Sequence, residues 1–293
     1  MSNIIEIQGL NYTYLPGSPY EHRALRDISL SLGRGEFLGV FGPNSSGKST
    51  LAKHLNGLVY PTSGTVRVCG IDTSVKEQRT GLWKKVGLVF QYPEQQIFEA
   101  SVYDEVSYGP RNLGLDESEI RDRVHDALEK VGLAPDPTSL LSPINLSGGI
   151  RRRVAIAGIL ALHPEIMVLD EPMAGLDPRG RRLVLDIINR RRENRNETTV
   201  MISHNLKEIL ALADKIAILD RGALVFFGGV GELQADSKLL ARFRFELPDY
   251  LQVVQALADR GIKVDTGIKD MNEAGSELIR VLSERRQPQT PSP

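Results

Sequence analysis

The segment GVFGPNSSGKST, residues 39–50, constrains what this chain can fold into more than any other stretch of the sequence. It begins within the apolar run Phe37–Phe41, which is typical of a strand, and it leads into the amphipathic pattern LAKHLNGL. A glycine-rich turn between a strand and a helix directs several backbone N–H groups toward one point, where an anion can bind. The segment therefore predicts a phosphate-binding loop at a helix N-terminus rather than a chance glycine-rich turn.

Each part of this loop has a chemical role under that interpretation. Gly42 and Gly47 allow the backbone to wrap around the β- and γ-phosphates of a nucleotide. Lys48 supplies a mobile positive charge, and Ser49 offers a hydroxyl group to Mg²⁺. The candidate phosphate-binding residues are Gly42, Pro43, Asn44, Ser45, Ser46, Gly47, Lys48, Ser49 and Thr50. The loop alone fits a GTPase, a kinase, a helicase or a transport motor, so a choice among them requires more sequence.

A second motif, IMVLDEP, places two carboxylates at the end of an apolar strand. At the carboxyl edge of a parallel sheet, Asp170 would lie beside the metal and Glu171 would face the γ-phosphate. Adjacent carboxylates more often form a helix N-terminal pair or a solvated turn, but the buried strand and the upstream loop favour a site here. Asp170 is therefore a candidate metal ligand and Glu171 a candidate general base.

The order of the expected elements predicts an α/β fold. Strand-like runs at residues 4–7, 28–32, 37–41 and 65–68 come first, and a helical insert follows from about residue 102. Within the insert, Asp116 and Glu119 match a capping box, and Gly132 is expected to end that helix. Apolar strands at 166–169, 199–203 and 216–219 then alternate with helical patterns, which indicates a parallel sheet covered on both faces.

Composition limits the binding partners and the cellular location that we expect for this chain. The 36 Lys and Arg nearly balance 37 Asp and Glu, so no global field attracts nucleic acid or anionic lipid. No apolar run is long enough for a membrane-spanning helix, and the first residues do not match a signal peptide, so we expect a cytoplasmic chain. Cys69 cannot form an internal disulfide, because it has no other cysteine to pair with, and it is expected to be a small strand residue.

A third motif, Asn145-Leu146-Ser147-Gly148-Gly149-Ile150, precedes the amphipathic helix RRRVAIAGIL. A serine and two glycines at a helix N-terminus make another anion site. Together with the two earlier motifs, this segment resembles the LSGGQ signature of the ATPase subunits of ABC transporters. Ile150 departs from the usual glutamine of that signature, but the phosphate contacts of the family fall on Ser147, Gly148 and Gly149.

The resemblance implies ATP and Mg²⁺ as cofactors and two ATPase subunits, identical or paralogous, that sandwich two nucleotides head to tail. It also implies a P-loop NTPase fold of the ABC ATPase type, with an antiparallel β subdomain and a helical signature subdomain. The expected divisions are a nucleotide-binding domain at residues 1–234 with a helical insert at about 92–162, a C-terminal α extension at 235–283 for dimerisation, and a disordered tail at 284–293.

Further positions are similar to the family residue by residue. Tyr14 matches the aromatic on which adenine stacks, with Tyr12 as the alternative, and the choice of ATP over GTP rests on the resemblance. Gln91 matches the glutamine that bridges Mg²⁺ and the membrane partner. Asp177, in the run Ala174-Gly175-Leu176-Asp177, matches the loop that senses the opposite subunit. His204, which ends the strand TTVMIS, matches the histidine that contacts the γ-phosphate.

The segment FQYPEQQIFEASVYDEVSYGPRNLGL, residues 90–115, resembles one branch of the family, the energy-coupling-factor importers of vitamins and transition metals. The resemblance implies a transmembrane scaffold protein, a substrate-binding membrane component and a place at the cytoplasmic face of the membrane. Gln95, Gln96, Ile97 and Phe98 are candidate contacts of the scaffold, although Ile97 and Phe98 would equally suit core packing. The C-terminal pieces Glu246-Leu247-Pro248 and Met271-Asn272-Glu273 loosely resemble the dimerisation extension of the same branch.

Two other functions compete with transport. A soluble ABC-type ATPase acting on ribosomes or DNA would usually carry two ATPase modules or a long coiled coil, and neither is present in this sequence. A degenerate interaction protein would lack the catalytic set, but Lys48, Asp170, Glu171 and His204 are all in place. The basic runs Arg151–Arg153 and Arg190–Arg192 with Arg195 are expected to be solvated or paired, so no nucleic-acid partner is predicted.

Overall fold

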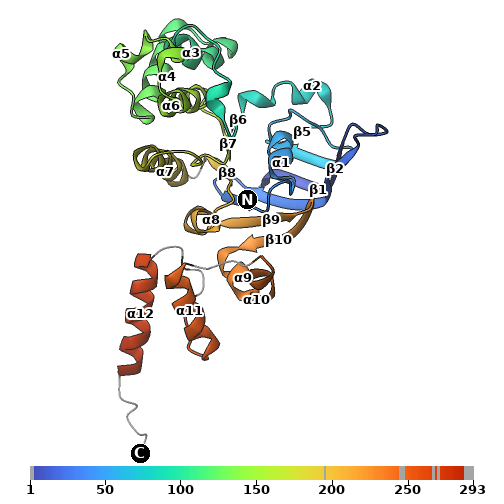
Figure 1. Cartoon of the computed structure of the whole chain (residues 1–293), viewed down its shortest axis with the longest axis vertical. Helices are drawn as coiled ribbons and strands as arrows, with labels where there is room; N and C mark the ends of the chain where they lie inside the picture. The colour runs from blue at the N-terminus through green and yellow to red at the C-terminus, as the bar shows by residue number, and fades with distance from the viewer. Residues whose placement is uncertain (1–2, 195, 244–247, 266–267, 269–270, 287–293) are drawn as a thin grey trace, which may run out of the picture.

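Strands from both halves of the chain join in one sheet in the computed structural model, which describes residues 3–194, 196–243, 248–265, 268 and 271–286. Within these residues the sheet has ten strands in the order β5-β4-β1-β2-β10-β9-β3-β8-β7-β6 (Figure 1). The strands are β1 Asn3–Tyr14, β2 His22–Gly33, β3 Phe37–Phe41, β4 Ser63–Val68, β5 Ile71–Asp72, β6 Val86–Val89, β7 Ile166–Asp170, β8 Thr198–Ile202, β9 Lys215–Asp220 and β10 Ala223–Gly229.

The helices lie around this sheet and in two outlying groups. They are α1 Lys48–Leu55, α2 Lys76–Arg79, α3 Val102–Asn112, α4 Glu117–Lys130, α5 Pro135–Ser139, α6 Gly148–Leu160, α7 Pro178–Glu193, α8 Leu206–Leu212, α9 Val230–Ala235, α10 Ser237–Arg242, α11 Asp249–Asp259 and α12 Met271–Arg286. Short 3-10 turns are formed by Leu82–Lys84, Pro93–Gln95 and Pro143–Asn145.

The parallel half of the sheet aligns the ends of four strands at one edge. Strand β3 pairs in parallel with β8 and β9, and β7 pairs in parallel with β6 and β8. The pairs Val89 with Leu169 and Asp170 with Ile202 show that these strands stop at the same level. The loops that follow β3, β6, β7 and β8 therefore leave the sheet side by side, as expected for a ligand site at the carboxyl edge.

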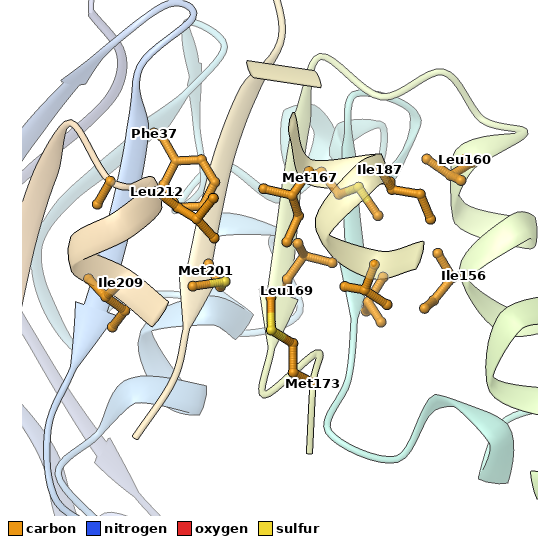
Figure 2. Packing of buried hydrophobic residues seen from close by; sticks show 14 of the residues in the cluster. Phe37, Ile156, Leu160, Met167, Leu169, Met173, Ile187, Met201, Ile209 and Leu212 are labelled. Carbon is orange, nitrogen blue, oxygen red and sulfur yellow. The ribbon is translucent and has the colours of Figure 1, made fainter. Parts of the chain in front are cut away.

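Alternate residues of the buried strands point to opposite faces of the sheet. In β7, Met167 and Leu169 belong to the hydrophobic cluster under α7 and α8, whereas Ile166 and Val168 belong to the cluster that includes Leu51 of α1. Figure 2 shows the first cluster, with side chains from the strands meeting those of the covering helices. Both faces are thus buried, which confirms the predicted α/β sheet with helices on its two sides.

The antiparallel half consists of β1, β2, β4 and β5, with β1 paired to both β2 and β4. It accounts for the strand-rich N-terminal segment and for the predicted β subdomain. Cys69 was expected within a strand, and that expectation is wrong. It lies just after β4 with a φ of 51°, in the turn that leads to β5.

Helices α3, α4, α5 and α6, which lie between β6 and β7 in the chain, form a helical lobe at one side of the sheet (Figure 1). Asp116 caps α4, because its side chain accepts from the backbone N–H groups of Ser118 and Glu119. The Glu119 carboxylate binds the Arg123 guanidinium at 2.7 Å. Gly132 adopts a φ of 67° just beyond the helix, as a stop signal requires.

The chain continues beyond the sheet into four helices, α9 to α12, of which α11 and α12 lie at the far end of the molecule (Figure 1). Helices α11 and α12 begin within residues 235–283, the segment expected to form a C-terminal α extension. Helix α12 runs to Arg286, three residues into the segment expected to be disordered, and residues 287–293 lie outside the described residues together with Arg195, Glu246 and Leu247. Among the described helices, none is both long and apolar enough to cross a bilayer.

Candidate functional site

The loop predicted to bind phosphate lies between β3 and α1. Gly47 precedes α1 with a φ of 101°, a conformation that suits glycine. Gly42 packs so closely on the chain that a Cβ there would come within 2.2 Å of the Leu219 carbonyl oxygen. The Lys48 ammonium donates to the carbonyls of Gly42 and Pro43, both at 2.8 Å, so that the lysine spans its own loop.

The Lys48 side chain sits in a charged environment. It is buried, and burial lowers the pKa of its ammonium, while Glu171 and then Asp170 act in the opposite direction. A buried cation facing two carboxylates at a helix N-terminus is suited to bind a polyphosphate and its metal.

Tyr14 lies over this loop at the end of β1. Its hydroxyl group is 3.2 Å from the Thr50 hydroxyl oxygen, and its ring forms one wall of a hollow of 230 Å³. The rest of the lining is His22, Ala24, Ser45, Ser46, Gly47, Lys48, Ser49 and Thr50. Tyr12, the alternative stacking residue, instead packs edge-on against Tyr14 and His54 and does not line the hollow. The geometry therefore favours Tyr14 as the aromatic beside a bound base.

Oxygen ligands suited to a hard cation gather at the end of β7. Asp170 is buried, which raises the pKa of its carboxyl group, and a hydrogen bond from Ser49 together with the charge of Lys48 opposes that rise. Gln91 follows β6, the strand paired with β7, and its side chain is exposed at the same edge of the sheet. Ser49 and Asp170 are thus in contact, and Gln91 lies just after the end of the neighbouring strand β6.

Glu171 and His204 form the next pair along this edge. The His204 Nδ1 atom lies 2.8 Å from the Glu171 Oε2 atom, and the Glu171 backbone N–H donates to the Ile202 carbonyl at 2.9 Å. Glu171 has a φ of 51°, in the left-handed region that costs a non-glycine residue about 1 kcal/mol or more. Such a conformation persists only where the surrounding structure holds it, here through the bonds to Ile202 and His204.

The signature residues form a different hollow, of 590 Å³. Ser147 caps α6, with its hydroxyl oxygen accepting from the Ile150 N–H, and Asp177 caps α7, accepting from the Gly180 N–H at 2.8 Å. Ser147, Gly148, Gly149 and Asp177 are all exposed. The hollow is lined by Ser147, Gly149, Ile150, Arg153, Gly175, Leu176, Asp177, Arg179, Gly180 and Leu183.

The predicted site residues therefore fall into two groups. The carboxyl edge brings together residues 42–50, Tyr14, Gln91, Asp170, Glu171 and His204. The signature group, Ser147 to Gly149 with Asp177, lies in a hollow that shares no lining residue with the phosphate loop hollow. The candidate site residues of one chain thus lie at two separate surfaces.

One buried cation of this region escapes prediction from sequence. Arg152 belongs to a basic run expected to be solvated or paired, yet it is only 4% exposed. Its guanidinium donates to the carbonyls of Glu171, Pro172 and Ala174. One sequence signal could have distinguished Arg152 from its neighbouring arginines. It occupies the first position after the signature that faces the buried side of α6. Arg191, of the second basic run, is likewise buried and pairs with Glu197 at 2.7 Å.

A groove of 510 Å³ lies between the helical lobe and the sheet, and its lining includes Val89 and Pro93, which flank Gln91 in the chain. Among the four residues predicted as scaffold contacts, Gln96 and Phe98 line it, and Ile97 packs against the hydrophobic core instead. Phe98 is 65% exposed and stacks edge-on against Tyr108. The wall includes Trp83, Leu88, Pro93, Glu105, Tyr108 and Ile159. This surface is mostly apolar, with Glu105 as its one acidic member among the described residues.

Comparison with known proteins agrees with these motifs. Residues 25–174 match the family model of the ABC transporter. The chain is 40% identical over 279 residues, covering 95% of this chain and 97% of its relative, to the energy-coupling factor transporter ATP-binding protein EcfA2 of Caldanaerobacter subterraneus subsp. tengcongensis. It is 41% identical over 285 residues, covering 96% of this chain and 98% of its relative, to the protein of the same name in Symbiobacterium thermophilum.

Solved structures with the same fold include cbiO1 from Clostridium perfringens, described as part of the ABC transporter complex cbiONQ. It superposes with a TM-score of 0.69 at 31% identity and covers 88% of this chain and 100% of its own. The ATP-binding cassette MJ0796, solved as a dimer with ADP and Pi, superposes with a TM-score of 0.69 at 26% identity, covering 77% of this chain and 98% of its own. The chain therefore belongs to the ABC transporter family of ATPases, in the branch of the energy-coupling factor ATP-binding proteins.

Proposed function

We propose that this chain hydrolyses ATP as one of two ATPase subunits of an energy-coupling-factor importer, at the cytoplasmic face of the membrane. The observation that carries the proposal is the separation of the phosphate loop hollow from the signature hollow on one chain. A single chain holds two incomplete surfaces for phosphate, and two chains placed head to tail would complete both. The relatives named above and the dimeric cassette support this arrangement.

The nucleotide site is assigned from the geometry at the carboxyl edge. ATP would place its base beside Tyr14 and its phosphates on residues 42–50. Mg²⁺ would be held by Ser49, Asp170 and Gln91, which offer hydroxyl, carboxylate and amide oxygens, the donor set that this hard cation prefers. When bound, the metal would neutralise charge on the β- and γ-phosphates. Ser147, Gly148, Gly149 and Asp177 of the second subunit would close over the same phosphates.

The chain's own residues then carry the hydrolytic step. Glu171 is the general base, because its carboxylate is buried at the strand end and faces His204. His204 orients that carboxylate and, being exposed on its other side, can contact the γ-phosphate. Lys48 and the N-termini of α1 and of the partner's signature helix stabilise the charge that develops during in-line attack by water. Closure of the dimer excludes bulk water and assembles the donors only when both subunits are present.

The groove between the helical lobe and the sheet is the surface proposed for the membrane scaffold. It combines apolar walls with exposed aromatic rings, Phe98 and Tyr108, and its lining residues Val89 and Pro93 flank Gln91 in the chain. A helix of the scaffold seated there would couple its movement to closure of the ATPase dimer. The helices α11 and α12 are proposed to strengthen the dimer, because α12 carries exposed Met271, Ile279 and Leu282 along one side.

A direct test is to isolate the tagged chain from membranes and identify the proteins that accompany it. The expected result is a second ATPase subunit, a transmembrane scaffold and a substrate-binding membrane component. In liposomes, that complex should take up one vitamin or transition metal upon ATP addition, and Glu171→Gln should abolish uptake without dissociating the complex. Recovery of the chain on ribosomes or DNA, with no membrane protein, would favour the soluble ATPase alternative and refute the proposal.

A further inference from the structure

Arg152 occupies an unusual position for a charged residue. It extends from α6, the helix that begins at the signature, and is 96% buried between that helix and the turn after β7. A buried guanidinium is unfavourable unless its N–H groups find acceptors. Here one nitrogen donates to the Ala174 carbonyl at 2.7 Å, and the other donates to the Glu171 and Pro172 carbonyls at 2.8 and 3.0 Å.

These three carbonyls belong to the turn that carries the general base. The Glu171 carbonyl also accepts from the Ala174 N–H at 3.2 Å, and the Met173 carbonyl accepts from the Leu176 N–H at 3.4 Å. Arg152 adds three hydrogen bonds to this turn. The turn must hold Glu171 at a φ of 51°, which an isolated chain would leave for the more stable right-handed or extended regions. The guanidinium supplies charge-assisted hydrogen bonds that offset this strain.

The opposite side of Arg152 faces the segment beside the scaffold groove. The 3-10 turn Pro93–Gln95 packs against α6, and Pro93 lines the groove. Burial lowers the pKa of Arg152, and the charge of Glu94 is the largest opposing influence. The Arg152 Nε and Glu94 Oε2 atoms are both buried, and neither has a hydrogen-bond partner in the part of the chain that the structure describes. One atom belongs to a donor and the other is an acceptor, so a rearrangement of the turn that joined them would satisfy both.

We propose that Arg152 is a positioning residue for Glu171, which it holds in the left-handed conformation through three backbone carbonyls. Glu94, on the groove side, influences the position of the Arg152 guanidinium through its negative charge. Since its side chain is buried and its hydrogen bonds go to backbone carbonyls, Arg152 would act through the turn and not on the substrate. It connects three elements that must act together: the signature helix, the turn of the general base and the wall of the groove. This inference rests on the proposed role of Glu171 as the base.

The test is a double-mutant cycle in the full-length chain assembled as the ATPase dimer, with single-turnover hydrolysis of labelled ATP. Arg152→Lys keeps the charge but cannot reach all three carbonyls, so we expect the hydrolysis rate to fall about tenfold or more, with ATP affinity within about twofold of wild type. In the Glu171→Gln background the same substitution should change the residual rate by less than about twofold. Additive losses in the two backgrounds would overturn the proposal.

Arg191→Lys is the matched control, because Arg191 is another buried arginine that donates to a carbonyl, that of Pro164, before the opposite end of β7. It should lose thermal stability to a similar degree and keep its hydrolysis rate. Hydrogen exchange of the peptide covering residues 171–176 gives a readout that does not depend on hydrolysis: exchange should accelerate in Arg152→Lys and not in Arg191→Lys. Equal exchange in the two variants would contradict the positioning role.

If Arg152→Lys does not fold, Glu94→Gln provides the second arm. It removes one charge from a half-buried side chain and should lower the hydrolysis rate about two- to fivefold in the wild-type background only. An unchanged rate would refute the role of Glu94, and equal losses with and without Glu171 would refute action through the base. A wild-type dimer that binds ATP but never hydrolyses it would instead refute the proposed function, while the exchange measurement would still decide the role of Arg152.

Discussion

Gly47→Ala is a stringent test of the phosphate loop, because the structure shows two reasons for destabilisation: an unfavourable backbone conformation and a steric clash. Gly47 has a φ of 101°, and an added Cβ would lie 2.7 Å from both the Ala24 carbonyl oxygen and the Leu25 Cδ2 atom. An L-residue in the left-handed region costs about 1–2 kcal/mol, and overpacking of a close contact costs about 1–3 kcal/mol more. We therefore expect the free energy of unfolding to fall by about 2–5 kcal/mol.

The same substitution should weaken ATP binding. The carbonyl of Ala24 belongs to β2 and cannot retreat without disturbing the sheet, so the loop itself must shift by several tenths of an ångström. The backbone N–H groups that start α1 would then be displaced from the phosphates. A loss of about 1.4 kcal/mol of binding free energy raises the dissociation constant for ATP tenfold. Urea unfolding and calorimetric titration with ATP measure the two effects on one preparation.

Gly70→Ala is the matched control for this prediction. Gly70 has a φ of 76° in the turn between β4 and β5, and a Cβ there would meet no atom of the described residues within 4 Å. It should therefore show only the conformational cost of about 1 kcal/mol, with unchanged ATP affinity. If Gly47→Ala lost no more stability than Gly70→Ala and bound ATP as wild type does, the assignment of this loop geometry would be refuted.

Four other predictions follow from the same geometry. Glu171→Gln should cut the turnover number about 10²- to 10⁴-fold and leave ATP affinity nearly intact; equal turnover in the variant would exclude Glu171 as the base. Lys48→Ala should weaken nucleotide binding and hydrolysis together, and a titration with wild-type affinity would contradict its phosphate role. Specific ATPase activity should rise with protein concentration as dimers form, whereas a flat dependence in a preparation shown to be monomeric would argue against a shared site. Burial raises the pKa of the Cys69 thiol to about 11, so at pH 8 iodoacetamide should alkylate it about 10²-fold more slowly in the folded chain than in urea; similar rates would show that the thiol is not protected.

Much of this architecture could be predicted because its determinants are local. The apolar run Phe37–Phe41 forms β3 with the predicted bounds, and the helical patterns expected between the later strands form α7 and α8. Pro178 is the first residue of α7, and Asn205 caps α8. Strand β10, at Ala223–Gly229, escapes prediction because its residues are all partly exposed and show no alternation. Its pairing with β9 depends on a partner strand rather than on its own pattern.

The site divides in the same way between local and distant determinants. The phosphate loop and the capping serine of the signature are set by residues within one turn of each other, so the sequence motif contains the geometry. The contact between His204 and Glu171 joins positions 33 residues apart, and it follows from sequence only because parallel strands end at one edge. No comparable rule predicts the contacts of Arg152 from sequence, since its partners are backbone carbonyls that any residue could supply. A basic run on a helix therefore predicts solvent exposure, and only the three-dimensional structure shows that one of its members supports the turn of the general base.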